Sequence, residues 1–207
     1  MKNKYPDQIY HYLLLGIVFI VGLWSVINPH DLFTWFLETF PAFIGLVVMT
    51  ATYRRFPLTP LAYTLIAIHC CILFVGGHYT YAEVPLFNWI RDAFHLARNH
   101  YDRLGHFWQG FGPAIVAREI IIRTSPLKKG KWLFFLVMCF CLALSACYEL
   151  LEWRVSVATG SAGDAFLGTQ GDIWDTQEDM ATAWMGSIAA LLVLPKLHDR
   201  QLARIKS

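Results

Sequence analysis

Six apolar runs, each long enough to cross a lipid bilayer, constrain this sequence more than any other feature. A helix needs about 17–25 apolar residues to cross a hydrocarbon core about 30 Å thick. The alternating segments of roughly ten residues that mark a membrane β-barrel are missing. The runs cover residues 9–27, 33–52, 58–76, 104–122, 132–151 and 180–194. They predict an all-α, polytopic membrane helix bundle of about six transmembrane helices, forming one domain over residues 1–207.

The composition agrees with this class of protein and excludes others. Of 207 residues, 56% are hydrophobic and only 15% are charged, whereas a soluble domain carries about 25% charged residues. A net charge of +2 without a basic, aromatic-interleaved patch argues against nucleic acid as a partner. The five cysteines lie within the apolar runs and lack metal-ligand spacing, so we interpret them as small buried side chains. The sequence has no nucleotide, flavin or haem motif.

The basic residues predict the orientation of the chain in the membrane. The two tails and the second and fourth loops hold 12 of the 17, and the opposite side holds four. Because positive loops stay in the cytoplasm, both termini are predicted to be cytoplasmic. The long loops 78–103 and 152–179 are then extracytoplasmic. The first has apolar residues at helical spacing, which is typical of an interfacial helix. Whether this helix covers a site as a lid stays open.

Ionisable side chains gather in three segments at the outer ends of the last three spans. Each segment places its acidic or His side chains three or four residues apart, which puts them on one helical face. The members are Asp102 and His106, then Glu149 and Glu152, and then Asp172, Asp175 and Asp179. Ionisable groups at membrane depth are costly, so such groups indicate a functional site. Acidic residues in a first turn can also be simple helix caps.

Close carboxylates raise one another's pKa unless a positive group neutralises them. Three solutions are open: a divalent cation, the flanking Arg103 and Arg154, or shared protons that would form an acid–base site. The candidate cofactor is one divalent metal ion, with seven candidate ligands: Asp102, His106, Glu149, Glu152, Asp172, Asp175 and Asp179. All of these except Asp179 are also candidate catalytic residues. The candidate substrate-binding residues are Arg103, Arg154, Tyr101 and Gln170.

Three motifs carry a resemblance to a known family. They are YDRLGHF at 101–107, YELLEW at 148–153 and GTQGDIWDTQEDM at 168–180. On these motifs the chain resembles the YjdF family of bacterial inner-membrane proteins along nearly its full length. That resemblance implies a multi-pass inner-membrane protein and supplies no activity. More distantly, the order of motifs is similar to that of VanZ-like membrane proteins, although Arg103 and Glu152 replace their Lys and Gln.

Three functions are compatible with these features. The first is an enzyme acting on a lipid or cell-envelope substrate reached from the outer leaflet. The second is a small proton- or cation-coupled carrier, against which stands the lack of a polar path, since the first three spans offer only Glu38 and His69. The third is a structural membrane protein without catalysis. In the fourth span, Gly110, Gly112 and Pro113 predict a kink or a close helix contact.

Overall fold

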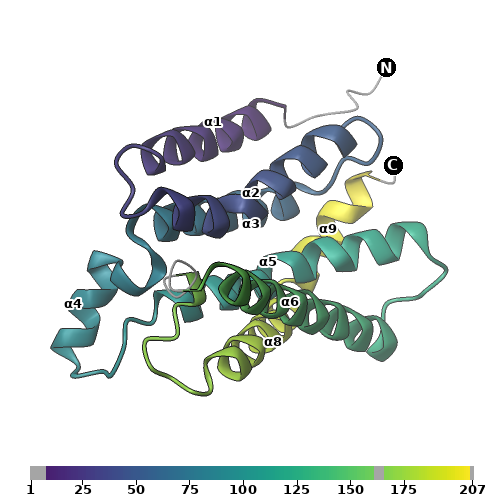
Figure 1. Ribbon diagram of the computed structural model, residues 1–207. Coiled ribbons are helices and arrows are strands. Elements are labelled where there is room, and N and C mark those ends of the chain that lie inside the picture. Colours follow the sequence, from purple (N-terminus) through teal and green to yellow (C-terminus); the bar gives the residue numbers. More distant parts are fainter. Residues whose placement is uncertain (1–7, 161–165, 206–207) are drawn as a thin grey trace.

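The computed structural model describes residues 8–160 and 166–205, which form helices and short loops with no strand among them (Figure 1). The elements are α1 (Gln8–Ser25), α2 (Leu32–Thr52), α3 (Pro60–Tyr79), the 3-10 turn η1 (Tyr81–Glu83), α4 (Pro85–Ala93), α5 (Tyr101–Thr124), α6 (Lys131–Thr159), α8 (Asp175–Val193) and α9 (Pro195–Ile205). Side-chain caps mark the start of α2 and α3. The Asp31 side chain accepts from the Thr34 N–H at 2.7 Å, and Thr59 caps α3 ahead of Pro60. The predicted all-α class is confirmed.

Membrane crossing follows from helix length and composition. Among the described residues, α1, α2, α3 and α6 are each long and apolar enough to span a bilayer. Helices α8 and α9, bent by 67° at the break between them, reach that length and hydropathy together. Helix α5 has 24 residues but carries Asp102 and Arg123 in its first and last turns, and it is not among these candidates. The protein is therefore a polytopic helical membrane protein, and the count of six spans stays a prediction.

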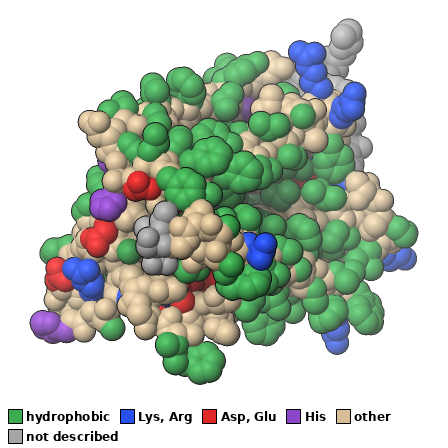
Figure 2. All heavy atoms as spheres, in the orientation of Figure 1, with side chains coloured by type: hydrophobic (Ala, Val, Ile, Leu, Met, Phe, Trp, Pro, Cys, Tyr) green, Lys and Arg blue, Asp and Glu red, His purple; other side chains and the backbone are tan. Residues whose placement is uncertain are grey.

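The bundle has two chemically different ends (Figure 2). Helix α4, the beginning of α5 and the beginning of α8 lie at one end, and α9 lies toward the other (Figure 1). Asp, Glu and His side chains, with a basic side chain beside them, are visible near α4, whereas most of the Lys and Arg side chains in this view lie toward the other end (Figure 2). Hydrophobic side chains cover much of the face between the two ends. This distribution suits a bundle that crosses a membrane with its acidic end on one side.

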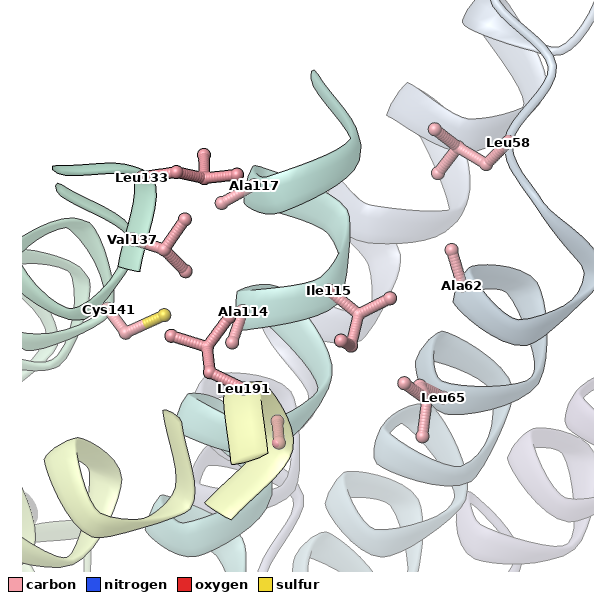
Figure 3. Packing of buried hydrophobic residues seen from close by; sticks show 11 residues of the cluster. Leu58, Ala62, Leu65, Ala114, Ile115, Ala117, Leu133, Val137, Cys141 and Leu191 are labelled. Atoms are coloured by element: carbon pink, nitrogen blue, oxygen red, sulfur yellow. The ribbon is translucent and has the colours of Figure 1, made fainter. Parts of the chain in front are cut away.

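Helix α5 lies at the centre and packs against α3, α6 and α8. In Figure 3, Ile115 of α5 lies beside Leu65 of α3, and Val137 of α6 and Leu191 of α8 belong to the same buried cluster. The contact with α8 requires glycine. A Cβ on Gly110 would lie 1.7 Å from the Ala183 carbonyl oxygen, and one on Gly186 would lie 2.1 Å from the Phe107 carbonyl oxygen. The close helix contact predicted at Gly110 is therefore confirmed.

Two predicted segments differ from the observed structure. The interfacial helix, expected over about residues 85–99, is shorter in the structure: α4 ends at Ala93, and His95 takes a left-handed φ of 53° that does not continue a helix. No helix is predicted beyond residue 194, yet α9 begins at Pro195. This short helix is amphipathic, with His198 and Leu202 buried, and it is too polar to stand out in a search for apolar runs.

Helix α9 is held to the bundle by a buried polar cluster. Glu119 of α5 accepts hydrogen bonds from the Thr59 N–H and hydroxyl at 3.1 and 2.7 Å and from Arg123 at 2.7 Å. The Nε2 atom of His198 lies 3.1 Å from Glu119, and its Nδ1 lies 2.7 Å from an Arg118 nitrogen. Because arginine can only donate, Nδ1 accepts and Nε2 donates. These groups satisfy one another, so we interpret the cluster as structural.

Candidate functional site

The structure brings the three predicted segments together at the acidic end of the bundle. Asp102 and His106 come from α5, Glu149 and Glu152 from α6, and Asp175 and Asp179 from the first turns of α8. All six side chains are buried. Burial of this many ionisable groups is expensive, so the cluster has to be stabilised by partners.

His106 lies at the centre of the cluster. Its Nε2 atom is 3.5 Å from Asp102 Oδ1, 3.5 Å from Glu149 Oε1 and 3.8 Å from Asp179 Oδ1. These distances exceed the roughly 2.7–3.2 Å of an ordinary N–H···O hydrogen bond. Among the described residues, Glu149 Oε1 has no hydrogen-bond donor although it is buried. One imidazole nitrogen therefore faces three carboxylate oxygens without bonding closely to any of them.

The other nitrogen of His106 decides where its proton lies. Nδ1 is 3.1 Å from Oε1 of Gln109, one helical turn further along α5. Since the amide oxygen of Gln109 accepts, Nδ1 donates to it, and Nε2 is the nitrogen that faces the carboxylates. A histidine that binds a metal usually has this arrangement, in which the nitrogen away from the ion donates to an oxygen and fixes the ring.

Three of these residues have the geometry of a metal site. One ligand atom each from Asp102, His106 and Asp179 lies within 4.8 Å of the others, and all three residues are buried. An imidazole and carboxylates are ligands that zinc and other divalent transition metals accept. Glu149 adjoins the group through His106. The donor set therefore fits one divalent cation.

Two arginines neutralise part of the charge. Arg98, which is buried, forms ion pairs with Asp102 at 3.7 Å, with Asp172 at 3.3 Å and with Asp175. Arg103 contacts the same Asp172 and Asp175 and also pairs with Asp179 and with Glu178.

Asp172 lies in the loop before α8 and links the two arginines. A hydrogen bond from the Trp174 N–H lowers the pKa of its carboxyl, partial burial opposes this, and Arg98 and Arg103 lower the pKa further. Asp172 therefore lies at the rim of the cluster as an ion-pair partner of the two arginines, and it is not among the carboxylates that face His106.

The predicted substrate-binding residues lie in different places. Arg103 is in the cluster, but its guanidinium is engaged by carboxylates. Arg154, predicted to flank the cluster, is exposed, and its guanidinium lies 5.7 Å from the centre of the Trp153 ring. Among the described residues no hydrogen bond or ion pair joins Arg154 to the carboxylates, because α6 continues past Glu152 and points it outward. The hydroxyl of Tyr101 donates to the Ile72 carbonyl oxygen at 2.8 Å, so it holds α5 to α3.

Gln170 shapes the loop that precedes α8. Its side-chain amide accepts from the Asn99 N–H and donates to the Asn99 carbonyl oxygen, both at 2.9 Å. The Gln170 backbone has a φ of 49°, which is unusual for a residue with a side chain. This double hydrogen bond holds the loop against the segment that contains Arg98. Gln170 is therefore a positioning residue in this structure.

Two residues of the site, Arg98 and Gln109, are not identified from the sequence pattern. Arg98 lies in a loop, three residues before α5, so helical periodicity does not mark it. Its spacing of four from Asp102 is the signal that could have identified it. Gln109 follows His106 by three residues on the same face of α5, and this spacing is the corresponding signal. Arg98 acts on the predicted ligands Asp102 and Asp175 through its charge. Gln109 acts on His106 by accepting the hydrogen bond from Nδ1.

The geometry and the helical fold describe a membrane protein with a buried ionisable site at one end. The chain belongs to the DUF2238 family, described as "Predicted membrane protein", which matches residues 10–200. It is similar to the inner membrane protein YjdF of Escherichia coli strain K12, with 49% identity over 185 residues that cover 89% of this chain and 88% of the relative. The family and this relative support an inner-membrane location. Neither supports the more distant resemblance to VanZ-like proteins, and no solved structure matches the chain.

Proposed function

We propose that this protein is a membrane enzyme whose acidic cluster binds one divalent cation and acts on a lipid or cell-envelope substrate. The observation that carries the proposal is the position of His106 Nε2, which faces oxygens of Asp102, Glu149 and Asp179 at 3.5–3.8 Å. Ligand atoms around a tetrahedral ion with bonds of about 2.0–2.2 Å lie about 3.3–3.6 Å apart. The spacing is therefore near that of atoms sharing an ion.

The charge balance supports a cation as well. The cluster contains six carboxylates: Asp102, Glu149, Glu152, Asp172, Asp175 and Asp179. Their basic partners among the described residues are Arg98, Arg103 and His106. Even with His106 protonated, three negative charges are left over. With His106 neutral, as a metal ligand, four are left over and a divalent cation offsets two of them; without the cation the carboxylates have to share protons.

The side chains suggest separate roles in such an enzyme. Asp102, His106 and Asp179 would hold the cation, with Glu149 as a fourth ligand or a nearby base. Glu152, one turn further along α6, is buried and has no hydrogen bond or ion pair to the described residues, so it is free to exchange a proton with a substrate. A bound divalent cation polarises carbonyl or phosphoryl oxygens and generates hydroxide from water. Arg98 and Arg103 position the carboxylates.

The orientation belongs to the same proposal. The acidic end would face the periplasm, and both termini would lie in the cytoplasm, as the positive-inside rule predicts. The site would then be reached from the outer leaflet. The arginine network favours one alternative in particular, a structural role in which ion pairs hold α5 to α8.

Lipid extracts of cells test the enzyme proposal. A strain lacking the gene is complemented with the wild type, with Glu149→Gln, or with the rim variant Glu178→Gln, and its lipids are compared by mass spectrometry. We expect a lipid or envelope precursor to accumulate without the gene, and to disappear with the wild type and with Glu178→Gln but not with Glu149→Gln. Identical extracts from all strains, with each variant inserted in the membrane, would contradict an enzyme. Cation-dependent uptake into proteoliposomes by the wild type would instead establish a carrier.

A further inference from the structure

A cavity of about 490 Å³ lies between α2, α3, α5 and α6. On α5 it extends from Gly105 to Ile120, which corresponds to about 22 Å of helix at 1.5 Å per residue. This length exceeds half of a hydrocarbon core about 30 Å thick. The cavity is therefore elongated in the direction that lipid chains take.

The cavity is an apolar groove that opens sideways. One rim consists of Ile44 and Val48 of α2, and the other consists of Phe140 and Leu144 of α6; all four side chains line the cavity and are exposed. Helix α2 packs on α3, whereas α6 packs on α5 and α8, so the rims belong to different parts of the bundle. Figure 2 shows hydrophobic side chains over this face. Since α2 and α6 are long and apolar enough to span a membrane, the opening faces lipid.

Polar groups are confined to a few positions of the lining. At the acidic end of the bundle, Tyr81, His106 and Tyr148 line the groove, and Gln109 lies one turn below His106. His69 of α3 is a further polar residue of the lining. His106 is thus both a wall of the groove and the centre of the carboxylate cluster. The groove and the candidate metal site are continuous through this one side chain.

We propose that the groove binds one hydrocarbon chain of a membrane lipid, inserted sideways between α2 and α6, with the lipid's polar head at His106. The bilayer supplies chains at this depth. Water would find few hydrogen-bond partners along most of the lining, whereas a chain matches it. The claim that the head meets a metal site rests on the proposed function, whereas binding of the chain does not.

Glycines on two helices offer a matched pair of variants. Gly45 of α2 lines the groove, and a Cβ built on it meets no atom within 4 Å. Gly16 of α1 also has open space within 4 Å but lies away from the groove. Gly45→Trp therefore fills the groove without a backbone clash, and Gly16→Trp adds the same side chain elsewhere.

The probe is a phosphatidylethanolamine with a diazirine in one acyl chain, reconstituted with the protein in nanodiscs. After photolysis, labelling of Leu144 and Cys147 in the groove is compared with labelling of the exposed Leu192 and Val193 on α8. We expect the groove residues to be labelled in excess in the wild type and in Gly16→Trp, with loss of that excess in Gly45→Trp. Labelling at Leu192 and Val193 should not change.

Three results would overturn the inference. The first is equal labelling of the groove and the α8 face in the wild type, and the second is an excess that persists in Gly45→Trp. Crosslinks between two copies of the chain at Leu144 would also overturn it, because a second copy would then occupy the groove. Metal content is measured on the same samples. A wild type that holds no metal but keeps the labelling excess contradicts the proposed function alone.

Discussion

The Nε2 atom of His106 on α5 lies 3.5 Å from Oε1 of Glu149 on α6, and that buried oxygen has no hydrogen-bond donor among the described residues. The opposite nitrogen of the ring is held by Gln109 at 3.1 Å. A carboxylate oxygen buried without a donor is costly. A cation between the two atoms would remove this cost.

Arg98 is expected to be essential for stability. Its side chain is 6% exposed and pairs with Asp102, Asp172 and Asp175. Because Arg98→Ala leaves buried carboxylates uncompensated, we expect a loss of about 3–5 kcal/mol in the free energy of unfolding. Thermal unfolding in detergent measures this change. Arg91→Ala removes an exposed pair with Asp92 and should change the stability far less, because solvent screens such pairs. Equal losses in the two variants would contradict the buried network.

The contact between α5 and α8 should not tolerate a methyl group at Gly110. Its Cβ would lie 1.7 Å from the Ala183 carbonyl oxygen, which is backbone and cannot rotate away. We expect Gly110→Ala to destabilise the protein by about 1–3 kcal/mol or more. The matched variant is Gly16→Ala, where a Cβ meets no atom within 4 Å. If thermal unfolding shows no difference between them, the two helices are further apart than described.

Asp31 provides a test of pH dependence outside the spans. Hydrogen bonds from Thr34, its backbone N–H first, lower the pKa of the Asp31 carboxyl below 3.8, although slight burial opposes this. A lowered pKa in the folded state adds stability above the ordinary pKa, and that stability is lost as pH falls through the lowered value. We expect hydrogen-exchange protection at the start of α2, measured relative to the intrinsic exchange rate at each pH, to fall below about pH 4.

Two variants separate the Asp31 cap from other acid effects. Asp31→Asn keeps a capping side chain that does not titrate, so its exchange at the start of α2 should lose the acid dependence. Asp31→Ala should exchange rapidly at every pH, because a lost cap costs about 0.5–2 kcal/mol. An acid dependence that persists in Asp31→Asn would show that another group is responsible.

Reporter fusions test the orientation. The acidic end and α9 lie toward opposite ends of the bundle (Figure 1), so the C-terminal tail identifies the side on which the cluster lies. We expect a C-terminal fluorescent protein to fluoresce and a C-terminal alkaline phosphatase to be inactive, since phosphatase matures only in the periplasm. An active phosphatase would place the carboxylate cluster in the cytoplasm and exclude substrates of the outer leaflet.

Much of this architecture could be predicted from sequence because two local signals are strong: the length of the apolar runs and the spacing of the ionisable residues. Apolar runs mark the long helices, and spacings of three and four place Asp102 with His106 and Glu149 with Glu152 on single faces. Alternating helix direction then brings these faces to one end. These are local rules, and they hold without knowledge of packing.

Other features depend on contacts that local rules do not contain. Arg98 reaches the carboxylates from a loop, and only the docked loop at Gln170 shows that it is buried. Arg154 follows Glu152 by two residues, but the continuing α6 helix directs it away from the cluster. The groove exists because α2 and α6 pack on different neighbours, which hydropathy does not reveal.

Metal stoichiometry of the purified protein tests the cation site most directly. The wild type, Glu149→Gln and Glu178→Gln are each incubated with a divalent metal, passed through a desalting column and analysed for bound metal, with folding checked by thermal unfolding. Glu178 is the matched control, since it contacts only the rim of the cluster through Arg103. We expect one ion per chain in the wild type and in Glu178→Gln, and loss of the ion in folded Glu149→Gln. A folded wild type that retains no divalent metal, or a Glu149→Gln variant that retains as much as the wild type, would contradict the site.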